Sequence, residues 1–299
     1  SSAASDVYKR QDKVTTVSPT YAQEILDPWF SHGLDGLLRQ KQYKLCGILN
    51  GIDVDVFNPA TDPDIPQNYD ANTVQQGKPV CKAALQDEFG LNKDGSPVMA
   101  MVTRLVGHKG VDLVRSIAEG LLQQGIELVI LGSGEAQYEN FFNELCARNP
   151  GRVGVYIGFN AKLAQRIYAG ADIFLMPSRS EPCGLAQMVS CRYGTIPVVR
   201  ETGGLRDSVQ PYNRFTGEGT GFTVQLGPNP ETLDPALNAA VDGGNTLITI
   251  EEPLLIIDEN NEIQPGQAES YEVSDDGLVW TFHLRDGLKW SDGSDLTAK

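Results

Sequence analysis

Histidine is scarce in this sequence: three residues among 299, widely spaced, do not suit a metal site built on histidine. The five cysteines are an odd number without a Cys-x-x-Cys pair, which disfavours a disulfide framework and a zinc site. The chain also lacks an apolar run of membrane-spanning length and an opening signal-peptide pattern. We therefore expect no bound metal, no membrane insertion and a cytoplasmic location.

A basic surface is lacking too, because the formal net charge is −15. This charge is unevenly spread: residues 225–299 hold 15 acidic and 3 basic residues, whereas residues 1–224 hold 24 and 21. An acidic balance disfavours nucleic-acid binding by bulk electrostatics. The abrupt change in charge predicts that two unlike pieces are joined near residue 225.

Between residues 14 and 224, short apolar segments alternate with amphipathic ones. Strands are predicted at residues 14–17, 45–49, 98–102, 127–131, 153–157, 173–176 and 196–199, and helices at residues 78–89, 111–123, 136–148, 161–169 and 185–193 and directly after Ser18. Apolar strands that alternate with helices predict an α/β fold with a doubly wound parallel sheet and helices on both faces. Residues 1–13 have no such pattern and are predicted to be a disordered leader, similar to a translated adapter tract.

The alternation stops after residue 224. A turn-rich segment follows, and strands are predicted at residues 247–250 and 254–257. Apolar residues then alternate with polar ones on both sides of Asp275-Asp276-Gly277, which predicts a β-hairpin. Residues 225–299 are therefore predicted to be a separate, β-rich fragment.

The most informative stretch follows the strand at residues 172–176. There, Glu181-Pro182-Cys183-Gly184 leads into a helix that starts at Leu185. The free N–H groups and the dipole at a helix start favour an anion. Glu181 at the same rim is able to accept hydrogen bonds from a neutral polyol. Together these features predict a site for a sugar that is attached to a phosphate.

Other candidate residues also follow predicted strands, at the edge of a doubly wound sheet where ligands bind. Arg104 and Lys109 are able to neutralise a diphosphate, although such a loop by itself is as readily an ordinary solvated one. Gly132-Ser133-Gly134 is a turn of a kind that ends many strands. Phe159 suits either stacking on a nucleobase or packing, and Cys183 suits a small residue in a tight turn better than a nucleophile.

At this point the motifs match a family. Residues 14–224 resemble the C-terminal, nucleotide-sugar domain of bacterial glycogen synthases and plant starch synthases. The resemblance is carried, in order, by Val14-Thr-Thr-Val-Ser-Pro-Thr-Tyr21, Gly47-Ile-Leu-Asn-Gly-Ile-Asp53, Arg104-Leu105, Lys109-Gly110, Leu131-Gly-Ser-Gly134, Glu181-Pro-Cys-Gly-Leu185, Arg192-Tyr-Gly194 and Thr202-Gly-Gly-Leu205. It implies the Rossmann-like second domain of a two-domain GT-B glycosyltransferase. The implied reaction is retaining transfer of glucose from ADP-glucose to the non-reducing end of an α-1,4-glucan, without an obligatory metal or other cofactor.

The resemblance also assigns roles to individual residues. It implies Glu181, Arg104 and Lys109 as catalytic residues, and Asn50, Gly132, Gly134, Phe159, Cys183, Gly184 and Leu185 as donor-binding residues. In this scheme the two cations hold the diphosphate, and Glu181 and Asn50 orient the glucose hydroxyls. The N–H groups around Gly184 and Leu185 bind the distal phosphate, and Phe159 takes the place of the family's adenine-stacking tyrosine.

Two departures qualify this expectation. The family's N-terminal domain is not found in the sequence, and catalysis in this family needs both domains to close over the donor. We therefore expect the chain alone to bind ADP weakly and to transfer no glucose. Residues 225–299, through Pro228-Asn-Pro-Glu-Thr-Leu-Asp-Pro-Ala236 and His283-Leu-Arg-Asp-Gly287, resemble the start of extracytoplasmic oligopeptide-binding proteins of ABC importers. This implies a partial periplasmic-binding-protein fold, a chimeric junction near residues 224–226, and peptide binding as the alternative function.

Overall fold

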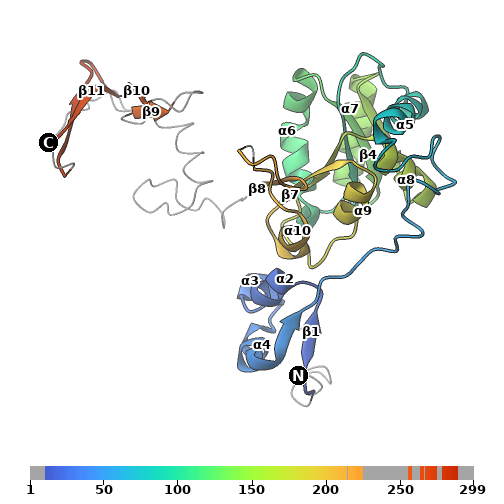
Figure 1. Ribbon diagram of the computed structural model, residues 1–299, viewed down its shortest axis with the longest axis horizontal. Helices are drawn as coiled ribbons and strands as arrows, with labels where there is room; N and C mark the ends of the chain where they lie inside the picture. The colour runs from blue at the N-terminus through green and yellow to red at the C-terminus, as the bar shows by residue number, and fades with distance from the viewer. Residues whose placement is uncertain are drawn as a thin grey trace. The chain divides into compact units, whose positions relative to one another are not determined.

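The computed structural model describes residues 11–213, 215–224, 255–257, 263–265, 267–274 and 278–288. The chain divides into two compact units, residues 1–224 and residues 225–299. In Figure 1 the first unit runs from blue to golden yellow, and the strands of the second are orange to red. Among the described residues, no helix is long and apolar enough to cross a membrane.

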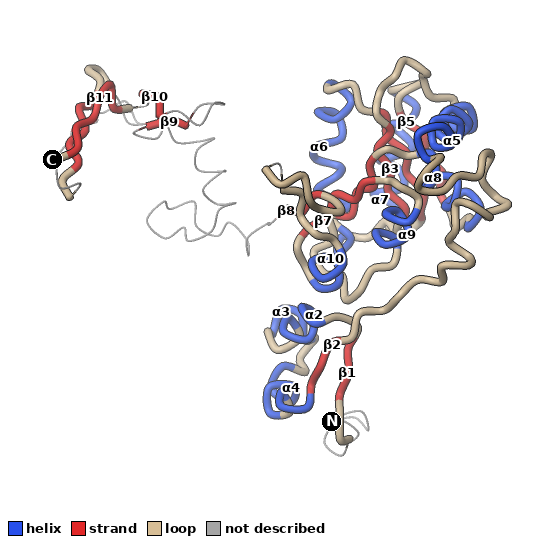
Figure 2. Tube along the Cα trace, in the orientation of Figure 1, coloured by secondary structure: helices blue, strands red, loops and turns tan. Residues whose placement is uncertain are grey.

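A six-stranded sheet forms the centre of the first unit (Figures 1 and 2). Its strands, in spatial order, are β5 (Val153–Ile157), β4 (Glu127–Gly132), β3 (Val98–Val102), β6 (Ile173–Met176), β7 (Ile196–Arg200) and β8 (Phe222–Val224). Every neighbouring pair is parallel. The chain moves outward in one direction from β3 to β5 and then crosses back to β6. The predicted doubly wound parallel sheet is thus confirmed.

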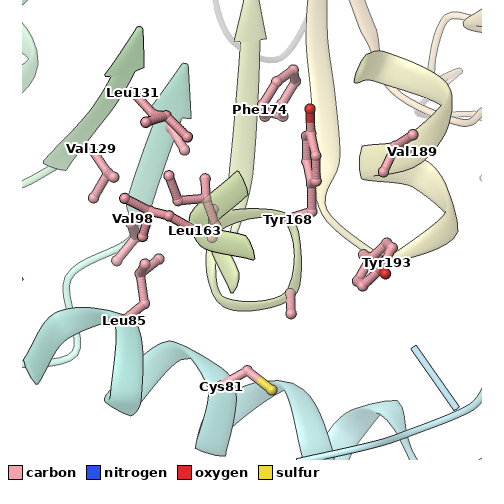
Figure 3. Close-up of a cluster of buried hydrophobic side chains, with 14 of the residues drawn as sticks. Cys81, Leu85, Val98, Val129, Leu131, Leu163, Tyr168, Phe174, Val189 and Tyr193 are labelled. Carbon is pink, nitrogen blue, oxygen red and sulfur yellow. The ribbon is translucent and has the colours of Figure 1, made fainter. Parts of the chain in front are cut away.

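Helices cover both faces of this sheet. They are α5 (Val74–Phe89), α6 (Val111–Gln123), α7 (Ala136–Arg148), α8 (Ala161–Gly170), α9 (Ala186–Arg192) and α10 (Gly203–Ser208). Each face of the sheet carries its own buried apolar cluster, because alternate residues of a strand point to opposite sides. Val98 lies in the cluster shared with α5, α8 and α9, and its neighbour Met99 lies in the cluster shared with α6 and α7. Figure 3 shows the first cluster, with Leu85 of α5 and Leu163 of α8 facing Val98.

The segment before this sheet folds differently from the prediction. Within the described residues, β1 (Val14–Thr16) and β2 (Leu45–Gly47) pair with each other alone, as a separate parallel ribbon. They are joined by α2 (Pro19–Glu24), α3 (Pro28–Ser31), α4 (Asp35–Gln40) and the short helix η1 (Gln42–Lys44). Gly47 approaches the turn into α2 so closely that an added Cβ would lie 1.9 Å from the Ser18 carbonyl oxygen. β2 thus packs against the turn into α2 and lies beside β1. The predicted cap on α2 is confirmed, since Ser18 Oγ accepts from the Tyr21 N–H.

Helix α5 begins at Val74, four residues before its predicted start. A start at residue 78 would put Pro79 in the first helical turn, where proline is best tolerated. In the structure Pro79 lies inside the helix. A side-chain turn precedes the helix instead: Asp70 Oδ1 accepts hydrogen bonds from the N–H groups of Asn72 and Thr73 and from the Thr73 hydroxyl.

In the second unit, the described residues form two antiparallel strand pairs. β9 (Leu255–Ile257) pairs with β10 (Ile263–Pro265), and β11 (Ala268–Val273) pairs with β12 (Trp280–Leu284). The pairing of Val273 with Trp280 confirms the predicted hairpin. Its Asp275-Asp276-Gly277 turn, the strand predicted at residues 247–250 and the first ten residues of the predicted leader lie outside the described residues.

Candidate functional site

The loops that follow β3 and β4 lie directly against each other at the carboxyl edge of the sheet. Leu105 pairs with Gly134 in an isolated parallel bridge. A Cβ added to Gly132 would lie 1.8 Å from the Thr103 carbonyl oxygen, and one added to Gly134 would lie 2.2 Å from that of Leu105. Both glycines are therefore required by close backbone approach. The Gly134 N–H already donates to Glu139 Oε1 at 2.7 Å.

The loop after β3 also lies beside the loop after β6. The Arg179 N–H donates to the His108 carbonyl oxygen at 2.9 Å. A Cβ added to Gly110, whose φ is +72°, would lie 2.2 Å from the Pro177 carbonyl oxygen. These backbone contacts bring the basic loop that holds Lys109 next to the turn that holds Glu181.

Lys109 and Glu181 meet across this boundary. Lys109 Nζ lies 2.5 Å from Glu181 Oε2, and the two side chains are only 16% and 9% exposed. Ser178, which is buried, donates to the same Glu181 oxygen at 3.1 Å. Sequence reasoning paired Lys109 with Glu181 but missed Ser178, because a serine after a strand carries no signal of its own. The carboxylate is thus held by one cation and one hydroxyl.

The loop after β3 carries two cationic side chains, Arg104 and Lys109, close to His108. Arg104 is exposed, and its Nη2 lies 3.3 Å from His108 Nε2. Partial burial, together with the charges of Lys109 and Arg104, lowers the pKa of His108. Arg104 and Lys109 thus place two positive charges beside His108, and such a pair of cations favours an anion.

The turn at residues 181–185 is tightly packed from behind. Gly184 has a φ of +68°, and α9 begins two residues later with no side-chain cap among the described residues. Cys183 is buried against α10: a Cβ added to Gly204 would lie 2.1 Å from the Cys183 carbonyl oxygen. Leu185 is half exposed. Burial of Cys183 supports the interpretation of a small residue in a tight turn over that of a nucleophile.

Phe159 and Asn50 stand apart from these contacts. Phe159 is 91% exposed, so the packing alternative is wrong for this side chain. It follows Gly158, whose N–H donates to the Gly132 carbonyl oxygen at 3.0 Å, so it lies near the Gly132 turn. Asn50 is exposed in the loop after β2. No hydrogen bond in the described part of the chain joins Asn50 to Glu181 or Lys109.

Sequence reasoning also missed a contact between α2 and α10. Glu24 Oε1 accepts hydrogen bonds from the Thr202 hydroxyl and the Gly203 N–H, both at 2.9 Å. The Thr20 hydroxyl donates to Asp207 Oδ1 at 2.6 Å. The partners are 178 to 187 residues apart in the sequence, so no spacing rule pointed to these contacts. Because the Gly204 N–H donates to the Glu181 carbonyl oxygen, this contact lies directly behind the candidate site.

Comparison with known families decides which class of protein this arrangement belongs to. Residues 84–250, more than half of the chain, match the family model described as glycosyl transferases group 1. The chain belongs to the group 1 glycosyl transferases. Within this glycosyl transferase, residues 8–40 also match the starch synthase catalytic domain, and residues 262–299 match the middle part of bacterial extracellular solute-binding proteins of family 5.

Among the individual relatives are glycogen synthases and a starch synthase. A glycogen synthase of Exiguobacterium sibiricum is 51% identical over 225 residues, which are 75% of this chain and 46% of that relative. A glycogen synthase of Geobacillus thermodenitrificans is 52% identical over 213 residues, 71% of this chain and 44% of that relative. The solved catalytic domain of starch synthase IV from Arabidopsis thaliana, bound to ADP and acarbose, is 36% identical with a TM-score of 0.70 and covers 83% of this chain and 49% of its own.

These matches confirm the predicted resemblance to glycogen and starch synthases and the predicted GT-B type of fold. The glycosyl transferase spans about half the length of the curated relatives it matches. The group 1 match runs to residue 250, past the end of the first compact unit at Val224. The place of the junction between the two pieces therefore stays a prediction.

Proposed function

We propose that residues 14–224 form the nucleotide-sugar-binding half of a glycogen or starch synthase. This enzyme transfers glucose from ADP-glucose, with retention of configuration, to the non-reducing end of an α-1,4-glucan. The observation that carries the proposal is the Lys109–Glu181 pair at the carboxyl edge of the sheet, beside the turn that leads into α9. A cation suits the diphosphate and a carboxylate accepts hydrogen bonds from the sugar, and this pair supplies both groups side by side.

Each predicted residue has a physical task in this proposal. Arg104 and Lys109 neutralise the diphosphate and stabilise the charge that builds on the departing ADP. The N–H groups of Gly184 and Leu185 bind the distal phosphate. Glu181, held by Ser178, accepts hydrogen bonds from the glucose hydroxyls.

The remaining donor-binding residues act through shape and contact. Gly132 and Gly134 keep the loops after β3 and β4 close together below the donor. Cys183 packs the turn against α10. Phe159, exposed beside the Gly132 turn, offers its ring to the adenine, and Asn50 contributes to the glucose contacts. The reaction uses no metal or other cofactor, and its location is the cytoplasm.

Calorimetric titration with ADP tests the donor site. The unaltered chain should bind ADP, and Lys109→Ala should weaken binding by about 10- to 100-fold, because a hydrogen bond to a charged group contributes about 1.5–3 kcal/mol. Lys93→Ala is the matched control, since Lys93 is an exposed cation paired with Asp87 on the surface. Its affinity for ADP should stay unchanged. Absence of ADP binding by the unaltered chain would reject the proposal.

A second candidate function rests on the match of residues 262–299 to solute-binding proteins. If that piece defines the activity, short peptides and not ADP should give binding heat in the same calorimeter. Transfer of labelled glucose from ADP-glucose to glycogen is measured in parallel, because it reports the complete reaction and not donor binding alone.

A further inference from the structure

The side chain of Gln187 is fully buried in the first turn of α9. Its Nε2 lies 3.1 Å from the Cys183 carbonyl oxygen and 2.9 Å from that of Gly184. The same nitrogen lies 2.9 Å from the Ser208 hydroxyl on α10. One amide group therefore faces both carbonyl groups of the turn and the neighbouring helix.

These contacts belong to a closed ring. The Ser208 hydroxyl donates to the Gly204 carbonyl oxygen at 2.6 Å, and the Gly204 N–H donates to the Glu181 carbonyl oxygen at 2.9 Å. The ring thus leaves the turn through Gln187, passes along α10 and returns to the backbone of Glu181. Both ends of the turn at residues 181–184 are fixed by the same network.

The ring also determines which way two N–H groups point. In a planar trans peptide the C=O and the N–H point in opposite directions. The Cys183 carbonyl shares its peptide with the Gly184 N–H, and the Gly184 carbonyl shares its peptide with the Leu185 N–H. Since both carbonyls face Gln187, both N–H groups face away from it. They are the two groups assigned above to the distal phosphate of the donor.

The space behind the turn is fitted to this side chain. Gly184 has a φ of +68°, and a Cβ added to it would lie 2.5 Å from Gln187 Oε1. That oxygen is buried and has no hydrogen-bond partner within the described residues. Burial of this oxygen without a partner costs free energy, and a purely apolar side chain would avoid that cost. The two N–H donors of the amide account for the presence of a glutamine here.

We propose that Gln187 is a positioning residue for donor binding: it holds two carbonyls inward so that the Gly184 and Leu185 N–H groups face the distal phosphate. This proposal rests on the proposed function. Gln187 does not touch the donor, so it acts only through the turn. Its contribution depends on the distal phosphate and is absent for a nucleotide that lacks that phosphate.

The test compares ADP with AMP, which lacks the distal phosphate. Gln187→Met keeps the volume of the side chain and removes both donors. The variant should lose about tenfold in ADP affinity, equivalent to one hydrogen bond to a charged group, while its AMP affinity stays within about twofold. The ratio of the two affinities is the readout, because a general loss of stability would change both affinities together.

Gln86→Met is the matched control. Gln86 is also a buried helical glutamine, and its Nε2 donates to the Asn92 carbonyl oxygen and to Glu127 Oε2, both at 2.8 Å. Its replacement should lower the melting temperature and leave the ADP-to-AMP ratio unchanged. Ser208→Ala opens the ring without touching the turn carbonyls and should lower the ratio about threefold, roughly half of the hydrogen-bond energy.

The outcomes separate the two proposals. If the unaltered chain prefers ADP to AMP and Gln187→Met keeps that preference, the positioning role is wrong and the donor site stands. If the unaltered chain binds neither nucleotide, the proposed function fails and the positioning role fails with it. If Gln187→Met does not fold, Ser208→Ala decides: an unchanged ratio overturns the proposal and a lowered ratio supports it.

Discussion

The Tyr193 hydroxyl donates to Asp62, with 2.5 Å between Oη and Oδ2, and joins two buried residues that are 131 positions apart. The Tyr69 hydroxyl adds a second link, because it donates to the Tyr193 carbonyl oxygen at 2.8 Å. Figure 3 shows Tyr193 in the buried cluster, below Val189 in this view. The long loop before α5 is thereby tied to the carboxyl end of α9, while the opposite end of that helix carries the turn with Gly184.

Removal of the Tyr193 hydroxyl should destabilise the first unit. Tyr193→Phe leaves the buried Asp62 carboxylate without this donor, which is expected to cost about 1–3 kcal/mol in the free energy of unfolding. Urea unfolding followed by circular dichroism measures the change. Tyr212→Phe, at a half-exposed tyrosine, should change the free energy of unfolding by less than about 0.5 kcal/mol. Equal effects of the two substitutions would contradict this role of Tyr193.

Stability should also depend on the protonation of Lys78. Lys78 Nζ donates to the Ala169 carbonyl oxygen and the Thr195 hydroxyl, and burial lowers its pKa from 10.5 to about 8. The folded pKa lies below the unfolded pKa, so the unfolded chain binds more protons between about pH 8 and pH 10.5. The contribution of Lys78 to the free energy of unfolding therefore rises with pH across that window.

Comparison with Lys78→Met isolates this contribution. Urea unfolding is measured at pH 7.5, 8.5 and 9.5, which lie within or near the window defined by the two pKa values. It gives, for each protein, the slope of the free energy of unfolding against pH. The slope should be smaller in the variant than in the unaltered chain. Parallel slopes would show that Lys78 titrates alike in the folded and unfolded states.

Two glycine substitutions should act in opposite directions. Gly132→Ala places a Cβ 1.8 Å from the Thr103 carbonyl oxygen and should cost at least about 1–3 kcal/mol, with a loss of ADP binding as the two loops separate. Gly120→Ala lies inside α6, where an added Cβ meets nothing within 4 Å. It should stabilise the fold by about 0.5–1 kcal/mol, because alanine is the better helix former. Thermal unfolding of both variants checks the two signs.

Binding of ADP should take up a proton at His108. Partial burial and the neighbouring cations lower the pKa of His108 in the free chain, and a bound diphosphate raises it again. ADP affinity should therefore increase as the pH falls below about 6.5, the ordinary histidine pKa. His108→Gln should lose this increase, although the titration of ADP itself remains in both proteins. Calorimetry in buffers of different ionisation enthalpy measures the proton uptake directly.

The sequence predicted the central sheet closely, and the reason is physical. The strands at residues 98–102 and 153–157 and the helix at 136–148 were predicted with their observed bounds. The reason is that the short apolar runs of the strands differ clearly from the helical spacing of apolar residues between them. The loops after the strands at residues 98–102 and 173–176 share one edge in a parallel sheet, which is why Lys109 and Glu181 were placed together.

Long-range polar pairing was not predictable in the same way. Glu24 meets Thr202, and Tyr193 meets Asp62, through tertiary packing that leaves no local trace in the sequence. The separate β1–β2 ribbon was missed because an apolar segment does not reveal which neighbour it pairs with. Gln187 was overlooked since a lone glutamine in an amphipathic helix normally faces solvent.

The contact between α2 and α10 has an evolutionary consequence. The two helices lie in segments that match different family models, yet Glu24 serves two donors at once, the Thr202 hydroxyl and the Gly203 N–H. A mutation that removes the carboxylate leaves both donors unsatisfied. We therefore expect the two positions to change together: among relatives, loss of the acid at position 24 should coincide with loss of the hydroxyl at position 202.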